Sequence, residues 1–353
     1  MPVPARLAAA ASAALIAAVP ASAVANGKPG PAPAVSAPIA TGLAGPLQLA
    51  VDGGHVYVAQ QFAGLLTRFD ADGTRTDTPV ADLDGIDVRD GSVTYATRSG
   101  EEEVTASTLT KLGPAGTVPT ADLLAYERRA NPDRVNTYGF ESIPADCAAQ
   151  LPAEIGPPSY TGQIDSNPFA VLLRNGRAYV ADAAANAILE VTRTGIRTVA
   201  VLPPQPAVIT RAAADELKLP ACAVGLTYDF EPVPTDVEAG PGNTLYVTTL
   251  PGGPESPVLG PRGAVQRIDV STGRIRTVAR GFLGATGLAV GPRGTLYVAE
   301  IFANRISTPG PDGPVTVAEV PSPSALEYAC GKLYVTYDVF ENGSLATISP
   351  VRR

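Results

Sequence analysis

The sequence contains no tryptophan and only one histidine among its 353 residues. Without tryptophan, a carbohydrate-binding platform of stacked indole rings is not available to it. The single histidine, His55, lies in the turn "DGGHVYV" and has no second histidine to share catalytic work. We therefore expect neither a Ser-His-Asp hydrolase nor a histidine-based lyase, and we interpret His55 as a solvated turn residue. Histidine and cysteine do not cluster, so no zinc site is predicted.

Long apolar runs are also missing, apart from one near the N-terminus. "LAAAASAALIAAV" (7–19) is an apolar run of 13 residues, which is too short for a membrane-spanning helix. It follows an arginine and precedes "PASAVA", which offers cleavage after Ala23 or Ala25, so residues 1–25 are interpreted as a secretory signal peptide. No cysteine lies near the cleavage point, and no later run approaches about 18 apolar residues. We therefore expect a secreted protein without a membrane anchor.

Basic residues are fewer than acidic residues. The chain carries 26 Lys and Arg against 34 Asp and Glu, a formal net charge of −8, which argues against nucleic acid and anionic membranes as partners. The 35 glycines and 35 prolines indicate a chain that is rich in turns, and stretches with a helical period are few. We expect a monomer that is built mainly of strands.

One short pattern recurs along the mature chain. Each copy is a strand, a tight turn that contains glycine, and a second strand with "LYV" or a similar triplet, which is the signature of a β-hairpin. We interpret the recurring tyrosine as a core residue between neighbouring units. Six copies align on this tyrosine: 46–60, 84–98, 167–182, 235–249, 286–300 and 324–337, with Tyr57, Tyr95, Tyr179, Tyr246, Tyr297 and Tyr334.

A second hairpin follows the first in these repeats, as in 65–80 and 265–279. Four short strands per unit, with a basic period of about 40 residues, predict the blade of a β-propeller. The fold that we predict is all-β: a six-bladed β-propeller of four-stranded antiparallel blades in a single domain, 35–353. The last repeat lacks a fourth strand, and residues 35–43 are expected to supply it, after a flexible linker over 26–34.

Three insertions interrupt the repeats, and all fall on one predicted face of the propeller. The first, 121–166, contains a short helical stretch over 121–130, and the second, 203–234, contains another over 211–219. The third, 250–263, enlarges a loop within the fourth blade. Because binding sites usually lie in elaborated loops on a rigid scaffold, this face is the predicted site.

The cysteines fit this arrangement. Cys147 lies in the first insertion and Cys222 in the second, and an exported protein matures in an oxidising compartment. We therefore predict a Cys147–Cys222 disulfide that ties adjacent loops together. Cys330 lies in a minimal turn on the opposite face, where we expect a free, packed thiol.

Acidic residues recur at the predicted axis, where the first strand of every blade lines a central channel. At one aligned position, blades two, four and six carry Asp87, Glu238 and Glu327, whereas the other blades carry apolar residues. Oxygen ligands that converge from several blades would suit Ca²⁺. The alternative is that these carboxylates are solvated, or paired with Arg98 and backbone amides. Five more residues at or near the channel mouth are candidate ligand contacts: Arg98, Asp182, Glu300, Asp236 and Asn167.

Longer motifs point to a known family. "IDSNPFAVL" (164–172) precedes "AYVADAAANAILEV" (178–191), and "VPTDVEAGPGNTLYVTTLPGGP" spans 233–254. With "LLAYERRANPD" (123–133), these stretches resemble the ScyD/ScyE family of secreted six-bladed propellers, and the resemblance covers essentially the whole mature chain. The resemblance implies an exported propeller and assigns no activity to named residues. The "GTLYVAE" units are shared more widely with NHL-type and gluconolactonase-like propellers.

These observations favour a non-catalytic protein that binds a small molecule, a glycan or a partner protein on its loop-rich face and channel mouth. One alternative is a calcium-dependent hydrolase or lactonase resembling gluconolactonases. There, Ca²⁺ in the channel would polarise a carbonyl and a channel carboxylate would act as base. The other alternative is a structural scaffold of the cell envelope. No catalytic residue is assigned, and calcium is the one cofactor considered.

Overall fold

The computed structural model describes four stretches of the chain: 33–101, 103–113, 116–254 and 256–349. The predicted signal peptide and all but the end of the predicted linker lie outside these residues. The expected all-β class is confirmed, since 54% of the residues are in strands and 12% in helices. Within the described stretches, no helix is long and apolar enough to cross a membrane.

Five of the recurring units form four-stranded antiparallel sheets, each with its strands side by side in chain order, as the repeats predict. We call them sheets 1 to 5. Their strands are β3 (Pro46–Asp52), β4 (His55–Gln60), β5 (Leu65–Phe69) and β6 (Arg75–Pro79); β7 (Leu83–Arg89), β8 (Ser92–Ser99), β9 (Ala106–Gly113) and β10 (Gly116–Asp122); β13 (Pro168–Arg174), β14 (Arg177–Asp182), β15 (Ala187–Thr192) and β16 (Gly195–Val201); β19 (Pro234–Ala239), β20 (Thr244–Thr249), β21 (Gly263–Asp269) and β22 (Ile275–Phe282); β23 (Ala285–Val290), β24 (Leu296–Glu300), β25 (Arg305–Gly310) and β26 (Gly313–Glu319).

Sheet 6 joins the two ends of the described chain. It contains β27 (Leu326–Ala329), β28 (Lys332–Tyr337) and β29 (Gly343–Ser349), together with β1 (Ala34–Val35) and β2 (Ala40–Leu43). Both N-terminal strands pair antiparallel with β29, for example Val35 with Ile348 and Ala40 with Leu345. Residues from the predicted 35–43 segment therefore complete the outer side of the last sheet, which leaves less of its edge unpaired.

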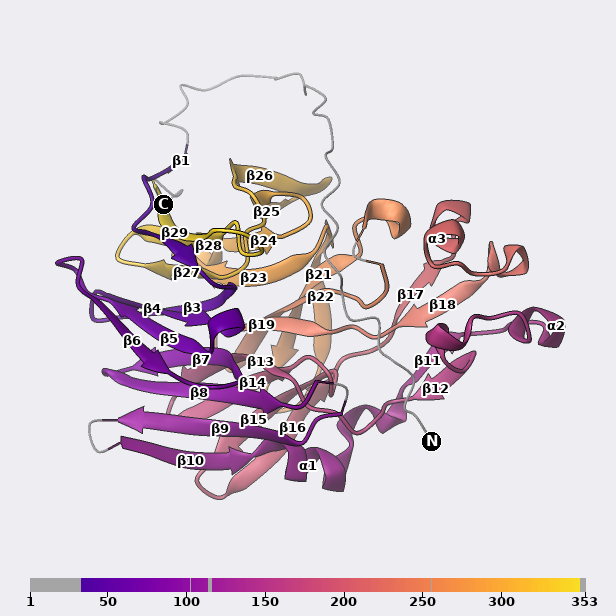
Figure 1. Ribbon diagram of the computed structural model, residues 1–353, viewed down its shortest axis with the longest axis horizontal. Coiled ribbons are helices and arrows are strands. Elements are labelled where there is room, and N and C mark those ends of the chain that lie inside the picture. Colours follow the sequence, from indigo (N-terminus) through magenta and orange to yellow (C-terminus); the bar gives the residue numbers. More distant parts are fainter. Residues whose placement is uncertain (1–32, 102, 114–115, 255, 350–353) are drawn as a thin grey trace.

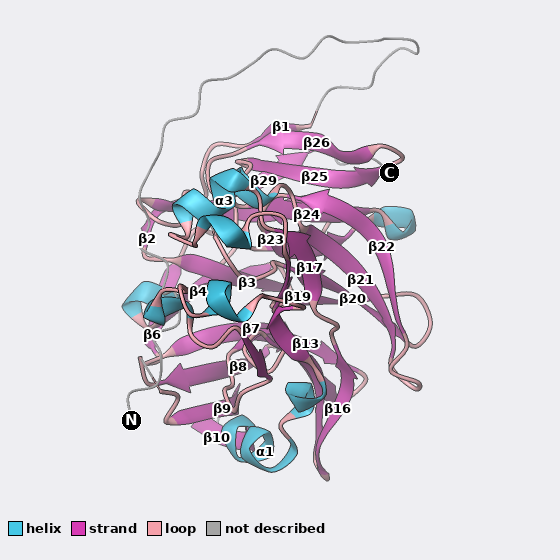
Figure 2. Cartoon of the chain, turned by 90° about the vertical axis from the view of Figure 1, so that its right-hand side faces the viewer, coloured by secondary structure: helices cyan, strands magenta, loops and turns pink. Residues whose placement is uncertain are grey.

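The first strands of the six sheets contact one another in chain order. β3 contacts β7, and the series continues through β13, β19 and β23 to β27, which in turn contacts β3. Figure 2 shows the first strands β3, β7, β13, β19 and β23 toward the middle of the molecule, with outer strands such as β6, β10, β22 and β26 toward its periphery. This is the neighbour order that a ring of six sheets requires.

The recurring tyrosines pack between neighbouring sheets. Tyr179 of sheet 3, for example, lies in one apolar cluster with Val237 and Val247 of sheet 4. Four of the six tyrosines are buried and two are partly exposed, so the interpretation as core residues holds most strongly for Tyr57, Tyr95, Tyr179 and Tyr297.

The strand register corrects one position of the sequence alignment. Tyr95 pairs with Ile86, whereas Tyr246 pairs with Glu238 and Tyr334 with Glu327. The shift belongs to Tyr95, because Asp87 and Glu327 each lie three residues before a two-residue turn, and Asp87 pairs with Thr94 where Glu327 pairs with Tyr334. Since a one-residue shift moves a side chain to the other face of a strand, Tyr95 packs toward sheet 1, whereas Tyr179 packs toward sheet 4, the next sheet in the chain.

The first two insertions build a further sheet that the sequence did not predict. We call it the insertion sheet; its strands lie in the order β12 (Ser159–Thr161), β11 (Thr137–Phe140), β18 (Thr227–Phe230) and β17 (Gln205–Val208). In Figure 1 this sheet and α3 lie on the right, to one side of the six other sheets. The pairing joins distant parts of the chain, with Gly139 opposite Asp229.

Both predicted helices are present. They are α1 (Leu123–Ala130) and α3 (Arg211–Glu216), and a third, α2 (Ala145–Ala148), is shorter. Asp122 caps α1 by accepting the Ala125 amide, and Thr210 caps α3 in the same way, which satisfies amides that the first turn leaves free. Six 3-10 turns complete the described structure: η1 (Gln61–Ala63), η2 (Pro132–Val135), η3 (Ala153–Ile155), η4 (Ala221–Ala223), η5 (Pro257–Leu259) and η6 (Pro292–Gly294).

The predicted disulfide is present, and two other expectations need correction. Cys147 of α2 and Cys222 of η4 form a disulfide with their Cα atoms 5.9 Å apart, which links the first two insertions. Cys330 is free, as expected, but it is exposed rather than packed because its side chain leaves a tight turn. His55 is partly exposed, but it is not simply solvated: its Nδ1 lies 2.6 Å from Asp70 Oδ1.

Candidate functional site: a pocket between the insertions

Asp87 and Asp236 act as ties between neighbouring sheets. Asp87 of β7 accepts hydrogen bonds from the Val88 amide and from the Leu173 amide on β13. Asp236 of β19 accepts from the Val237 amide at 2.8 Å and from the Leu288 amide on β23 at 2.6 Å. Burial raises the pKa of Asp87 to about 6 and that of Asp236 to about 7, although these amides oppose the shift. Their carboxylate oxygens are thus already engaged by the backbone.

Glu238 and Glu327 are the acidic pair that remains on the first strands. Burial, followed by the charge of Glu327, raises the pKa of Glu238 well above its usual value. Burial, followed by the charges of Asp87 and Asp236, raises the pKa of Glu327 to about 8. Across the described stretches, no three Asp, Glu, His or Cys side chains are placed to hold a metal ion. Calcium binding by Asp87, Glu238 and Glu327 stays a prediction.

Asp182 and Glu300, the predicted channel-mouth contacts, are fully buried caps. Asp182 accepts from the Asn167 amide at 2.7 Å and from Ser166 Oγ at 2.6 Å. Glu300 accepts from the Leu283 amide at 2.7 Å and forms an ion pair with Arg305, also at 2.7 Å. In both sheets, the side chain that ends the second strand binds an amide that leads into the first strand. The repetition indicates an architectural role.

Arg98 and Asn167 lie close to this buried region as well. Arg98 donates to the Gly100 carbonyl at 2.7 Å, and its guanidinium lies 3.6 Å from Asp165 Oδ1. The Asn167 amide caps Asp182, whereas its side-chain Oδ1 is buried without a hydrogen-bond partner. The eight residues proposed from the sequence thus divide between ties, caps and buried acids, and none of them lines the pocket described next.

A pocket of about 340 Å³ opens where the three insertions meet. This volume lies at the lower end of the range of small-molecule sites. The insertion sheet, the end of α3 and the enlarged loop of sheet 4 all contribute to it. The lining residues are Glu154, Ile155, Gly156, Pro157, Tyr160, Gln163, Ile209, Leu217, Leu219, Tyr228, Phe230, Glu231, Val233, Leu250, Gly252 and Gly253.

The aromatic wall of the pocket follows from strand alternation on β18. Tyr228 and Phe230 are two residues apart, so they share one face of the strand, and their ring centroids are 4.6 Å apart. Tyr228 also packs edge-on against Phe140 of the neighbouring strand β11, at 4.9 Å. These rings belong to an apolar cluster that includes Cys147 and Ile209, so the disulfide supports the wall from behind.

The opposite wall is the start of the third insertion, which is fastened to the chain after β18. The Leu250 amide donates to the Val233 carbonyl at 3.0 Å. Arg262 lies over the Phe230 ring at 4.5 Å and donates to the Gly252 carbonyl at 2.8 Å. Gly253 has a positive φ, and any Cβ there would meet the Phe230 ring at 2.5 Å, so this close approach requires glycine.

Glu231 supplies the inner polar group of the pocket. Tyr160 Oη donates to Glu231 Oε1 at 2.9 Å, and Asn186 Nδ2 lies 3.4 Å from Oε2. Glu154, a second acid, is exposed at the rim. Among the described residues that line the pocket, none is lysine, arginine or histidine. The pocket therefore combines an apolar, aromatic body with acidic character.

Sequence reasoning located the region but missed the individual residues. The pocket lies within the three insertions that the repeat alignment isolated, as expected for elaborated loops. Tyr160, Tyr228, Phe230 and Glu231 were not singled out, because nothing in their local pattern distinguishes them from other loop residues. The alternation "TYDF" over 227–230 was the one available signal, since it marks a short strand with both rings on one side.

The fold places the chain among known β-propeller proteins. Its structural neighbours are propellers of the NHL, gluconolactonase and virginiamycin B lyase kinds. The PQQ-bound aldose sugar dehydrogenase of Streptomyces coelicolor superposes with a TM-score of 0.53 at 12% identity, over 90% of this chain and 98% of that one. A gluconolactonase of Xanthomonas campestris superposes with a TM-score of 0.50 at 11% identity, over 85% and 84%.

A virginiamycin B lyase of Staphylococcus aureus is also similar, with a TM-score of 0.48 at 15% identity over 90% of this chain and all of that one. No protein-family model and no curated protein sequence matches the chain. At these identities the likeness concerns the fold alone, so the function has to be argued from the pocket.

Proposed function

We propose that the protein is a secreted six-bladed β-propeller of the ScyD/ScyE kind that binds a small molecule in the insertion pocket and does not transform it. The contact order of the six first strands, with β1 and β2 completing the last sheet, supports the six blades. The Cys147–Cys222 disulfide supports export, because such bonds persist in oxidising compartments. Export also agrees with the signal-peptide pattern in residues 1–25.

The chemistry of the pocket selects the class of ligand. Its aliphatic and aromatic lining favours a molecule with an apolar body, and its volume of about 340 Å³ favours a small one. Glu231 lies inside the pocket and Glu154 lies at the rim, without a basic residue among the described lining. A carboxylate beside aromatic rings favours a cation. The ligand that fits best is a small apolar amine.

A binding role without catalysis is supported by the same lining. Covalent or acid–base catalysis needs a nucleophile, or an acid and a base, within hydrogen-bond reach of one substrate atom. The described lining holds no serine, cysteine, histidine or lysine, and its inner carboxylate, Glu231, already accepts from Tyr160. The pocket is therefore suited to binding a ligand rather than to converting a substrate.

The alternatives make different predictions. A calcium-dependent lactonase would hydrolyse lactones only with calcium. A structural envelope scaffold would bind no small molecule in the pocket. A glycan or protein partner would engage the exposed loops and would not depend on Glu231.

The test compares three probes of similar shape: 2-phenylethylamine, 2-phenylethanol and phenylacetate. We expect the amine to bind most tightly and the anion least tightly by isothermal titration and ligand-observed NMR. Glu231→Gln should remove the preference for the amine, whereas Glu341→Gln, which changes an exposed acid outside the pocket lining, should keep it. Leu250→Trp should block all binding by filling the pocket. Equal binding of the three probes, or binding that survives Leu250→Trp, would contradict the proposal.

A further inference from the structure

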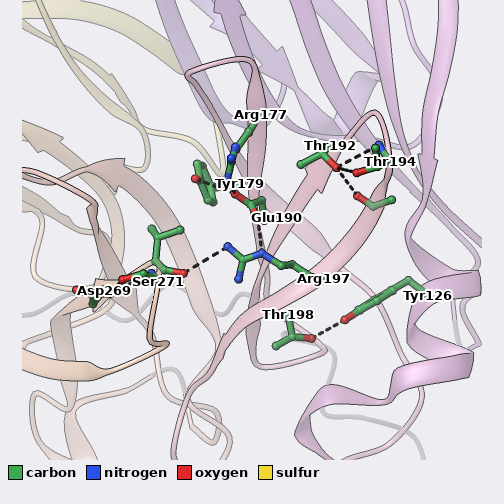
Figure 3. Close-up of polar contacts among 12 residues, drawn as sticks. Tyr126, Arg177, Tyr179, Glu190, Thr192, Thr194, Arg197, Thr198, Asp269 and Ser271 are labelled. Carbon is green, nitrogen blue, oxygen red and sulfur yellow. Dashed lines mark hydrogen bonds and ion pairs between the residues drawn. The ribbon is translucent and has the colours of Figure 1, made fainter.

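Most deeply buried carboxylates in the described chain accept hydrogen bonds from nearby donors. Glu190 of sheet 3 is an example. Glu190 is 2% exposed and forms ion pairs with Arg177 and Arg197. Tyr179 Oη donates to it as well, at 3.1 Å. Figure 3 shows these groups converging on the one carboxylate. Although burial alone would raise the pKa of Glu190, the hydrogen bonds from its two arginines lower it.

Glu127 is the exception to this pattern. It lies on α1, its side chain is 1% exposed, and neither Oε1 nor Oε2 has a hydrogen-bond partner. Leaving a buried polar group unpaired costs about 1–3 kcal/mol, and more for a charged one, so native proteins rarely do so. Something other than the described protein groups must therefore satisfy these two oxygens.

Two neighbouring side chains have free oxygens of the same kind. Asn131, which caps the C-terminal end of α1 and whose backbone amide donates to the Glu127 carbonyl, has an unpartnered Oδ1, while its Nδ2 donates to the Gly162 carbonyl at 3.1 Å. Asp133 is 1% exposed and has an unpartnered Oδ1, while Asn186 donates to its Oδ2 at 2.9 Å. In both residues, the other polar atom of the side-chain end group already forms a hydrogen bond, which fixes the orientation of the free oxygen.

Gly162 contacts both Asn131 and Asp133. Its carbonyl binds the Asn131 amide, and a Cβ added to it would lie 1.9 Å from Asp133 Oδ1. Any larger residue at this position would therefore collide with the carboxylate. The backbone of the first insertion is thus packed directly against the two side chains.

The surroundings of Glu127 are strongly negative. Glu127 is buried near the acidic side chains of Asp182, Asp133 and Asp165. Asp182 and Asp165 are themselves buried, and the guanidinium of Arg98 lies 3.6 Å from Asp165. Positive charge is therefore needed where Glu127 and Asp133 meet.

We propose that Glu127, Asn131 and Asp133 bind a structural calcium ion at the point where α1 passes into the first insertion. Carboxylate and amide oxygens are the ligands that calcium prefers, and its sites commonly add backbone carbonyls and water. The described chain has no group of three convergent acids, and this set requires only two carboxylates with one amide oxygen. The site is separate from the first-strand carboxylates and does not depend on the pocket ligand.

The experiment uses the full mature protein after removal of divalent cations with a chelator. Calcium should raise the melting temperature by a few degrees, as expected for a ligand that binds the folded state at many times its dissociation constant, and magnesium should raise it less. Terbium should bind in place of calcium and show luminescence sensitised by Tyr126 or Tyr138. Added calcium should displace it.

Isosteric variants decide whether the named residues form the site. Glu127→Gln and Asp133→Asn should each lose the calcium-dependent shift and the terbium signal, whereas the exposed Glu319→Gln should keep both. Glu127→Gln keeps the size of the side chain and cannot ionise, so with chelator it should be at least as stable as the wild type, which separates lost binding from misfolding. Absence of calcium binding in the wild type, or an unchanged response in Glu127→Gln, would overturn the proposal. Glu127 would then be a buried protonated acid.

Discussion

Replacing Glu327 with glutamine should change how the stability of the protein depends on pH. In the folded protein, burial and then the charges of Asp87 and Asp236 raise the pKa of Glu327 from 4.5 to about 8. In the unfolded chain the same group ionises near its usual pKa. Between these two values the folded state retains a proton that the unfolded state has released. The free energy of unfolding must therefore fall as pH rises through this window.

The magnitude follows from linkage. One group that is protonated in the folded state and ionised in the unfolded state contributes a slope of about 1.4 kcal/mol per pH unit. Between pH 5.5 and 7.5, the ideal loss is about 3 kcal/mol, and partial exposure of Glu327 to solvent reduces our expectation to about 2 kcal/mol. Glutamine cannot ionise, so the variant lacks this loss. Glu238 responds to the charge of Glu327, so its own pKa should also fall in the variant and flatten the profile further.

The assay is urea unfolding at several pH values, followed by circular dichroism, because the chain has no tryptophan for fluorescence. We expect Glu327→Gln to gain stability relative to the wild type as pH rises from 5.5 to 7.5, and to differ little from it near pH 4. Glu341→Gln, an exposed change, should follow the wild-type profile. Wild-type and Glu327→Gln profiles that run parallel would refute the argument that this carboxyl is held protonated.

Three further predictions concern the ties and caps. Replacing Cys147 and Cys222 with serine should cost about 2–4 kcal/mol and make the insertion sheet the first region cut in limited proteolysis, with the repeat sheets still protected. Glu300→Gln should lower the free energy of unfolding by about 3 kcal/mol because it breaks a buried ion pair with Arg305, while calorimetry should show unchanged binding of 2-phenylethylamine. Asp87→Asn should cost about 1–3 kcal/mol in chemical unfolding, because one of two amides loses its acceptor.

The repeat sheets were predictable because their information is local. Each hairpin contains its own alternation of apolar residues and its own turn, so the pattern around Tyr57 or Tyr297 specifies the pairing without distant residues. The insertion sheet has no such local signal. Its strands are three or four residues long, and Gly139 must find Asp229 across a large part of the chain. Only the cysteines indicated that the two insertions meet.

Charge was a poor guide to the pocket for a physical reason. A carboxylate at the end of a strand has the same sequence pattern whether it faces a ligand or caps a backbone amide. Glu300 and Asp182 proved to be caps, and Asp87 and Asp236 proved to be ties. Glu231 follows a strand in the same way, yet it lies in the pocket. The difference depends on packing between elements, which the local pattern does not contain.

The pocket and the disulfide depend on each other. A sheet of such short strands is marginal by itself and needs other support. Here that support is the apolar cluster beneath β11 and β18, which contains Cys147, together with its covalent bond to Cys222. If the bond were reduced, the aromatic wall with Tyr228 and Phe230 would lose its anchor, whereas the six repeat sheets have no cysteine bridge to lose. If the protein binds a ligand in this pocket, as proposed, the intact disulfide holds the aromatic wall in place, which agrees with the proposed export to an oxidising compartment.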